Sequence, residues 1–332
     1  MCSISTGNKN TQDKIDDGIY PFYVRSQTVE RINSWTFDGE AILTAGDGVG
    51  VGKVFHHTYG KIGVHQRVYI LSDFKCDANY LFHFFSSKFY NRVKRMSAKN
   101  SVDSVRKEMI TDMSLSLPSH QEQVKIGHLL SLLDERIATQ NKIIDKLQSL
   151  IKGIAQHCIR VLINGWEYVR LGDICKITTG KLDANAQVEN GQYPFFTCAE
   201  RPFNIDSYAF DTEALLISGN GANLGYINYY KGKFNAYQRT YVLDHFSVNI
   251  QYVKWALKVL LPKRIAIEKS SSNTPYIVLS TLADLKIPIP NNSKQNHIAN
   301  LMQSFERELS NQLALNDLYN KQKQYMLRQM FI

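Results

Sequence analysis

The feature that most constrains this chain is an internal duplication, because its 332 residues contain one unit twice at a period of about 172 residues. Residues 2–7 (CSISTG) correspond to residues 175–180 (CKITTG), and the pair Gln66 and Arg67 recurs as Gln238 and Arg239. Two long copies are typical of a tandem duplication, whereas a solenoid stacks many short repeats. The sequence therefore predicts two similar domains.

Each copy begins with short apolar and β-branched runs separated by Gly, Asp and Asn turns, which is typical of strands. These runs are residues 41–44, 51–56 and 64–71 in the first copy and 214–218, 224–230 and 239–243 in the second. Helical spacing follows at 81–93, with Asp77 as the expected N-cap, and at 251–261. Period-two apolar residues then predict strands at 113–117 and 285–289. Each copy is expected to be an α+β domain.

A long amphipathic helix is predicted after each globular part. Ser119 and Glu122 have the spacing of a capping box, so the first helix should begin there. Apolar residues then recur alternately four and three positions apart, which is the heptad spacing of a helix that packs along one seam. At about 1.5 Å per residue, residues 122–157 form a rod of roughly 50 Å. The second helix, from residue 294, has a weaker seam, and Gln312 falls at the position of Gln140.

The two helices are predicted to pair as one intramolecular antiparallel coiled coil with pseudo-two-fold symmetry, Gln140 and Gln312 setting the register. The alternative is that each helix merely lies on its own domain. The expected domains are globular at 1–117 and 165–289 and helical at 118–164 and 290–332. Residues 165–174 open the second copy without a counterpart before Cys2, so the first domain is expected to lack its opening segment.

Bulk composition narrows the class of protein. The formal charge of +9 favours a polyanionic partner. Neither an 18-residue apolar run nor a signal peptide is present, which predicts a cytoplasmic protein without a membrane span. The five cysteines are odd in number and lack Cys-x-x-Cys spacing, which argues against a disulfide framework and a zinc site.

Two short segments are similar to motifs that enzymes use to bind nucleotides or to methylate DNA. The glycines at 46–50 and 219–223 are not followed by Gly-Lys-Ser/Thr and lead into a strand, so a nucleotide site is disfavoured. Residues 273–276 (NTPY) are similar to the Asn-Pro-Pro-Tyr motif of adenine methyltransferases, but the second residue is Thr and no glycine-rich cofactor loop follows an upstream strand. An adenine-specific DNA methyltransferase therefore stays as a competing function.

The start of the first long helix resembles a known family. Residues 117–137 (LPSHQEQVKIGHLLSLLDERI) are similar to the proline, Glu-Gln and Leu-Asp-x-x-Ile signature in DNA specificity subunits of type I restriction-modification systems. Residues 166–174, with Leu171 and Gly172, resemble the usual opening of a target-recognition domain. The second copy departs from the signature, with Lys294 for the glutamate and Phe305 followed by glutamate for Leu-Asp.

The resemblance implies two target-recognition domains, each reading one half of a split site in double-stranded DNA. The helices would act as a ruler and as a docking surface for two methyltransferase subunits. Catalysis, S-adenosylmethionine and ATP would belong to those partners and to a translocating nuclease subunit, so this chain is expected to hold no cofactor and to be no enzyme. A regulatory subunit that binds methyltransferase but not DNA is a further alternative.

Candidate DNA contacts are residues on predicted loops that can bind phosphate, hydrogen-bond to bases or fill a groove. In the first copy they are Arg25, Lys53, His57, Arg67, Lys99, Asn100, Ser101 and Arg106. In the second copy they are Thr197, Arg201, Tyr226, Tyr229, Arg239, Lys269, Ser271, Asn273 and Thr274. Domains that read different half-sites should differ where they touch bases, so residues shared by both copies are expected to be scaffold or phosphate contacts. A solvated or structural role is the alternative for each single arginine.

Overall fold

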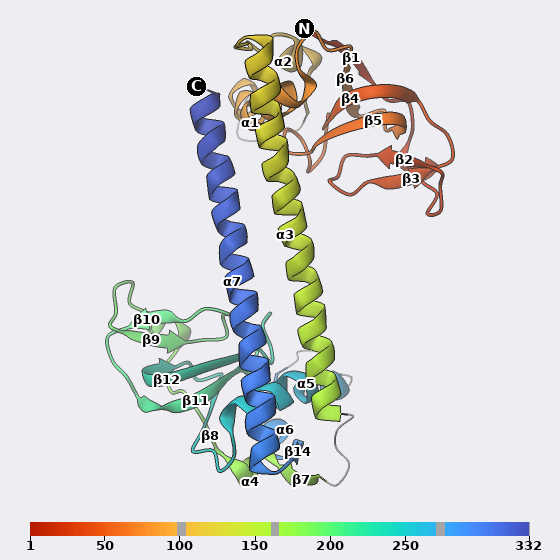
Figure 1. Ribbon diagram of the computed structural model, residues 1–332. Helices are drawn as coiled ribbons and strands as arrows, with labels where there is room; N and C mark the ends of the chain where they lie inside the picture. Colours follow the sequence, from red (N-terminus) through yellow and green to blue (C-terminus); the bar gives the residue numbers. More distant parts are fainter. Residues whose placement is uncertain (98–103, 161–165, 270–275, 332) are drawn as a thin grey trace. The chain divides into compact units, whose positions relative to one another are not determined.

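The computed structural model describes residues 1–97, 104–160, 166–269 and 276–331. The chain divides into unit 1, which comprises Met1–Lys142 and Ala314–Ile332, and unit 2, which comprises Ile143–Leu313. Both boundaries fall inside the two long helices, α3 (His120–Arg160) and α7 (Asn292–Met330). Each unit therefore contains a six-stranded sheet, shorter helices and a part of both long helices, and unit 2 also contains a two-stranded sheet of β7 and β14, whose labels appear in Figure 1.

The sheet of unit 1 has six strands in the order β1-β6-β4-β5-β2-β3. The strands are β1 (Ser3–Thr6), β2 (Tyr20–Tyr23), β3 (Glu30–Ile32), β4 (Phe37–Ala45), β5 (Phe55–Val64) and β6 (Val68–Ser72). All neighbours pair antiparallel except β2 and β5, which pair in parallel. A 3-10 turn, η1 (Thr11–Asp13), follows β1.

Helix α1 (Ala78–Met96) packs on one face of this sheet through Phe85 and Phe89, which contact the buried residues Ile42 and Leu71. It begins where the sequence predicts, since the amide of Tyr80 donates to the Asp77 carboxylate at 2.8 Å. A short helix, α2 (Lys107–Thr111), completes the unit. Strand residues that point to the other face form a second small core among themselves.

The sheet of unit 2 repeats the same topology, in the order β8-β13-β11-β12-β9-β10, with one parallel pair between β12 and β9. Its strands are β8 (Lys176–Thr179), β9 (Tyr193–Phe196), β10 (Phe203–Ile205), β11 (Phe210–Ser218), β12 (Ile227–Ala236) and β13 (Thr240–Asp244). The turn η2 (Ala184–Ala186) and the helices α5 (Ile250–Lys269) and α6 (Leu279–Ala283) correspond to η1, α1 and α2. The duplication and the α+β content predicted from the sequence are therefore confirmed.

Unit 2 has two elements with no counterpart among the described residues of unit 1. They are β7 (Glu167–Arg170) and the helical turn α4 (Leu171–Ile174). β7 pairs antiparallel with β14 (Lys286–Ile289), and Leu171 is fully buried in the core of unit 2. These elements come from the opening segment that the sequence comparison found in the second copy alone.

Several strand predictions were wrong. Residues 51–53 form a turn before β5, in which Gly52 has a positive φ of 64°, and residues 65–67 form the hairpin turn between β5 and β6. The first copy has no strand at 113–117, although its counterpart is β14. A strand is defined by its partner, and β7 supplies one only in unit 2.

Helix α3 begins with the predicted capping box: the amide of Ser119 donates to Glu122 at 3.1 Å, and the amide of Glu122 donates to the Ser119 hydroxyl at 3.4 Å. Within unit 1, α3 contacts α7 through an ion pair of Asp134 with Lys323 and a 2.8 Å hydrogen bond from Arg136 Nε to the Tyr319 hydroxyl. Within unit 2, parts of both helices pack on the core around α5.

The predicted glutamine pair falls in different units. Gln140 is buried in unit 1, and Gln312, in unit 2, donates to Glu308 Oε1 at 2.6 Å. The pairing of these glutamines and the predicted domain limits at 1–117, 118–164, 165–289 and 290–332 stay predictions.

Candidate nucleic-acid interface

Four loops of unit 1 meet at the end of β4 and are named loop cluster 1: residues 24–29, 46–54, 65–67 and 104–106. Backbone hydrogen bonds join three of these loops, and the loop 24–29 is joined to them through the Arg25 side chain, which donates to Asp47. The amide of Gly46 donates to the Arg67 carbonyl at 2.7 Å, and the amide of Val105 donates to the Gly46 carbonyl at 2.7 Å. Asp47 forms a bridge with Ser104. Segments that are distant in sequence therefore form one surface.

Two predicted arginines, Arg25 and Arg67, meet at this surface around Asp47. The Asp47 carboxylate lies 3.0 Å from Arg25 Nη1 and 3.7 Å from Arg67 Nε. Both guanidinium groups stay accessible, since the Arg25 and Arg67 side chains are 43% and 66% exposed. Two cations share one anion, so the cluster keeps a positive charge with which it can attract phosphate.

A buried histidine supports the Arg67 turn. His65 is 4% exposed, and its Nδ1 accepts the amide of Arg67 at 3.0 Å. Burial, assisted by the nearby charge of Arg25, lowers the pKa of His65 below its ordinary value. The ring is therefore neutral near pH 7 and acts as an acceptor that holds the turn in place.

The glutamine that precedes each repeated arginine belongs to the scaffold. Gln66 Nε2 donates to Asn10 Oδ1 at 2.6 Å, and Gln238 Nε2 donates to Asp183 Oδ1 at the same distance. Both bonds tie the hairpin turn to the segment at the start of the 3-10 turn. The expectation that shared residues include scaffold is met at these two positions.

Lys53 also lies in loop cluster 1, where its ammonium group stands 5.0 Å from the centre of the Tyr90 ring. Arg106 is the N-cap residue of α2, and its Nη2 donates to the Met96 carbonyl at 3.4 Å. The structure thus places four of the predicted residues of the first copy, Arg25, Lys53, Arg67 and Arg106, on loop cluster 1, and it brings the side chains of Arg25 and Arg67 together at Asp47.

Unit 2 repeats this frame in loop cluster 2, which comprises residues 197–202, 219–226, 237–239 and 276–277. The amide of Gly219 donates to the Arg239 carbonyl at 2.8 Å, and the amide of Ile277 donates to the Gly219 carbonyl at 2.9 Å. Asn223 Nδ2 adds a bond to the Cys198 carbonyl at 3.0 Å. Arg239 is therefore held in its turn by the same backbone hydrogen bonds that hold Arg67 in unit 1.

The side chains on the two frames differ. Cys198 occupies the position of Arg25, and Asn220 the position of Asp47. Tyr226, which is 40% exposed, follows the same glycine as Lys53 does in the first copy. Loop cluster 2 therefore presents a neutral amide and an aromatic ring where loop cluster 1 presents charges.

Of the candidates expected on loops, His57 and Tyr229 lie instead within strands, and for Tyr229 this agrees with the strand predicted at 224–230. They lie within β5 and β12, on the face that contacts the helix, where His57 stacks on Phe82 at 5.6 Å and Lys254 lies 5.8 Å from the Tyr229 ring. His57 Nε2 lies 3.0 Å from Glu40 Oε1, and the Tyr229 hydroxyl donates to Glu213 at 2.6 Å. Burial, together with the Glu213 carboxylate, raises the pKa of Tyr229.

The other candidates are dispersed. Thr197 is buried, and its hydroxyl accepts the amide of Ala199 at 3.2 Å, which stabilises the loop. Arg201 is exposed on loop cluster 2, and Lys269 is the last residue of α5. Six candidates lie outside the described residues: Lys99, Asn100, Ser101, Ser271, Asn273 and Thr274.

Asp47 and His65 were missed from the sequence. Asp47 lies in a glycine-rich turn, and such a turn predicts only a connection between two strands. Its replacement by Asn220 in the second copy could have indicated a residue that differs between the two candidate sites. His65 precedes the repeated Gln-Arg pair, and Tyr237 takes its place in the second copy. In the described part of the chain, no three His, Cys, Asp or Glu side chains gather as metal ligands, and no helix is long and apolar enough to cross a membrane.

Comparisons with known proteins bear on both copies. The family described as "Type I restriction modification DNA specificity domain" matches residues 1–149 and 163–316. The specificity subunit of the type I restriction enzyme EcoDI from Escherichia coli is 46% identical over 134 residues, which are 40% of this chain and 30% of that protein. The MjaIX specificity subunit of Methanocaldococcus jannaschii is 24% identical over 276 residues, which are 71% of this chain and 64% of that protein. The matches thus span less than two thirds of these relatives.

Solved structures show the same fold. The crystal structure of a type I restriction-modification S subunit from M. genitalium aligns with a TM-score of 0.75 and 17% identity, covering 100% of this chain and 94% of that one. A chain from a structure on complex assembly of the type I R-M system aligns with a TM-score of 0.56 and 17% identity, covering 91% and 83%. At such identities the likeness concerns the fold alone.

Proposed function

Because the chain belongs to the family of type I restriction-modification DNA specificity domains, we propose that it is the DNA specificity subunit of a type I restriction-modification complex. Each unit would read one half of a bipartite double-stranded DNA target through its loop cluster. The observation that carries the proposal is that both clusters have the same backbone frame but different side chains. A reader of two unlike half-sites needs this combination.

The shared and the differing residues have separate roles in this proposal. Arg67 and Arg239 occupy equivalent turns and contact DNA phosphates, which carry no sequence information. Arg25 and Lys53 contact bases of one half-site, because Cys198 and Tyr226 replace them in the second copy. Asp47 orients Arg25 before DNA binds.

The proposal assigns α3 and α7 to the spacer, as an antiparallel coiled coil with pseudo-two-fold symmetry between the copies. Contacts inside each unit support it: Leu130 and Leu133 of α3 share a cluster with Phe331 in unit 1, and Ile151 of α3 shares one with Met302 of α7 in unit 2. Such helices offer docking surface for two methyltransferase subunits and a nuclease subunit. Catalysis and S-adenosylmethionine belong to those partners, and this chain is a non-catalytic reader.

The test begins with methylated-base mapping of DNA from cells that express this chain with its methyltransferase subunit, which defines the bipartite site. Gel shifts with the assembled complex then compare R67A with R25A. Removal of the phosphate contact should weaken binding about tenfold on every sequence and reduce its salt dependence. R25A should lose discrimination at one half-site and keep it at the other, since one base contact contributes about 1–3 kcal/mol.

The matched control is K321A, since Lys321 is 71% exposed on α7 and pairs only with the neighbouring Asp317 at 2.7 Å among the described residues. Unchanged DNA binding by both loop variants would overturn the assignment of loop cluster 1. Calorimetry with S-adenosylmethionine tests the methyltransferase alternative, because tight binding by this chain alone would favour it. A complex that forms with methyltransferase but never shifts DNA would favour a regulatory subunit.

A further inference from the structure

One turn of loop cluster 1 exposes an apolar side chain completely. Residues 48–50, which we name the tip, have the sequence Gly-Val-Gly, and Val49 is 100% exposed. An apolar side chain stabilises a fold only to the extent that it is removed from water, so this valine adds nothing to the stability of unit 1. Its methyl groups remain available to a ligand that binds at loop cluster 1.

The tip has the same backbone conformation in both copies, where residues 221–223 are its counterpart. Gly48 and Gly221 have φ angles of 77° and 78°, a left-handed conformation that glycine adopts without strain. In each copy the amide of the third residue after this glycine donates to the glycine carbonyl, at 3.1 and 3.2 Å. Ala222 is therefore the counterpart of Val49, and it is exposed as well.

The residue that follows the exposed side chain is fixed to a neighbouring loop in each copy. Gly50 packs so closely on the Arg25 carbonyl that a Cβ on this glycine would stand 2.3 Å from that oxygen. Asn223 replaces the glycine in the second copy and donates to the Cys198 carbonyl at 3.0 Å. Both contacts hold the tip in a defined position.

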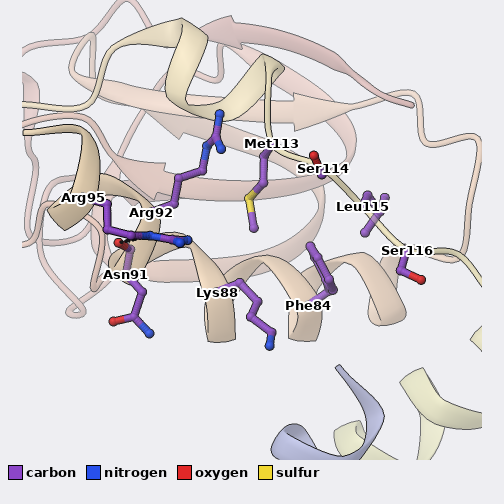
Figure 2. A pocket seen from close by; sticks show the side chains of 9 residues that line it. All are labelled: Phe84, Lys88, Asn91, Arg92, Arg95, Met113, Ser114, Leu115 and Ser116. Carbon is purple, nitrogen blue, oxygen red and sulfur yellow. Dashed lines mark hydrogen bonds between the residues drawn. The ribbon is translucent and has the colours of Figure 1, made fainter. Parts of the chain in front are cut away.

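Helix α1 supports the loop on the other side of the tip. Figure 2 shows Arg92 pointing from α1 toward α2, and its Nε and Nη2 donate to the carbonyls of Met109 and Asp112, each at 2.8 Å. Just before α2, Val105 donates its amide to the Gly46 carbonyl at 2.7 Å. The loop is thus anchored before and after the tip, and a preorganised contact loses little conformational entropy on binding.

The tip lies beside the positive charge of loop cluster 1. A Cβ placed on Gly48 would stand 3.9 Å from Arg25 Nη1, so this guanidinium group lies next to the residue that precedes Val49. In the major groove of DNA, arginine can bind O6 and N7 of guanine, and the apolar feature is the C5-methyl group of thymine. A small aliphatic side chain beside an arginine therefore matches a thymine methyl beside the base that the arginine contacts.

We propose that Val49 recognises the C5-methyl group of a thymine in the half-site that unit 1 binds. The inference rests on the proposed function, which assigns loop cluster 1 to that half-site. The γ-methyl groups of Val49 contact the thymine methyl and remove it from water, next to the base that Arg25 contacts. Ala222 has no γ-methyl groups, so the second half-site depends less on such a contact.

The test uses the assembled complex and its bipartite duplex, in which each thymine of the two half-sites is replaced in turn by deoxyuridine, which lacks only the methyl group. At one position, within the half-site at which R25A loses discrimination, deoxyuridine should weaken binding of the wild type about fourfold, the factor for one buried methyl-sized group. V49A should bind the thymine duplex about fourfold more weakly than the wild type and should no longer distinguish it from the deoxyuridine duplex.

The matched control is A222V, which changes the equivalent residue of the second copy. It should leave the effect of deoxyuridine at that position unchanged. V49A should keep the thermal transition of the wild type, because the side chain that it shortens is fully exposed.

The role of Val49 would be wrong if the wild type bound every deoxyuridine duplex as tightly as the thymine duplex, or if this half-site held no A·T pair. A deoxyuridine penalty that V49A retains in full would also contradict it. In these cases the effects of R25A and R67A would still support the proposed function. If both arginine variants bound DNA as the wild type does, loop cluster 1 would not be the interface, and both proposals would fail.

Discussion

At the scale of single residues, one glutamine in each copy ties a long helix to its globular domain. Gln123 Oε1 accepts the amide of Asp77 at 3.1 Å, while its Nε2 donates to the Pro118 carbonyl at 2.9 Å. Gln295 makes the same two bonds in unit 2, to Asn249 and Pro290, at 3.0 and 2.8 Å. Both side chains are buried. The glutamine of the Glu-Gln signature is therefore explained by helix attachment rather than by DNA contact.

Replacement of Gln123 should weaken this attachment. Q123L buries a methyl group against the amide of Asp77 and leaves that amide and the Pro118 carbonyl without partners, which costs about 1–3 kcal/mol each. Hydrogen exchange followed by mass spectrometry should show reduced protection of α1 and unchanged protection of α5. Q295L is the matched variant and should show the reverse. Equal protection of α1 in Q123L and the wild type would contradict the role.

His83 should make the stability of unit 1 depend on pH between 6.5 and 4, and unit 2 has no histidine at the equivalent position. The ring is 1% exposed, its Nε2 lies 3.2 Å from Ser131 Oγ, and its Nδ1 lies 3.7 Å from Asp134, which also pairs with Lys323. Burial lowers the pKa of His83 to about 4, Asp134 acts in the opposite direction, and Lys323 and His57 add to the lowering. Trp255 occupies the equivalent position in unit 2.

The sign of the effect follows from proton uptake. Below pH 6.5 the unfolded chain protonates this histidine while the folded chain does not, so the stability of unit 1 should fall as the pH falls from 6.5 toward 4. Protection of α1, corrected for intrinsic exchange, should therefore decrease between pH 6.5 and 5 more than that of α5. H83Q should reduce this difference. An α1 profile that does not change with pH would show that the ring is not held neutral.

At the scale of elements, local signals were sufficient for helices and insufficient for strands. The capping box at Ser119 and the heptad spacing are written within α3 itself, so the helix was predicted close to its observed start. The strand predicted at 113–117 failed because a strand needs a partner, which β7 provides in unit 2 and no described residue provides in unit 1. Apolar alternation reports which face is buried, and it does not report whether a neighbouring strand exists.

In the candidate site, too, the sequence indicated the residue types but not the contacts that depend on the fold. Residue type alone made Arg25 and Arg67 candidates. Their meeting at Asp47 depends on the fold, because Arg25 lies 22 residues before Asp47 in the sequence. His57 was placed on a loop because the length of β5 could not be read from a run interrupted by glycine turns. Comparison of the two copies carries a further signal, since the shared Gln66 belongs to the scaffold, whereas Asp47, which was missed, is replaced by Asn220 in the second copy.

At the scale of the whole molecule, α3 and α7 are each divided between the two units, so damage to one helix bears on both. Ile144 is 6% exposed, and Leu147 packs on the core of unit 2. I144D with L147D places two carboxylates at this seam, at a cost of more than about 3 kcal/mol. If the helices pair as one coiled coil, both units should lose protection in hydrogen exchange and the cooperative thermal transition should disappear.

The matched control is I143D with L150D, which places the same charges at positions that are 44% and 51% exposed on the same helix. That variant should keep the thermal transition of the wild type, because the carboxylates stay in water. Loss of protection confined to one unit in the seam variant would mean that each long helix serves its own domain alone. Loss in both units, with the control unaffected, would assign α3 and α7 to one shared spacer, as the proposed function requires of the two long helices.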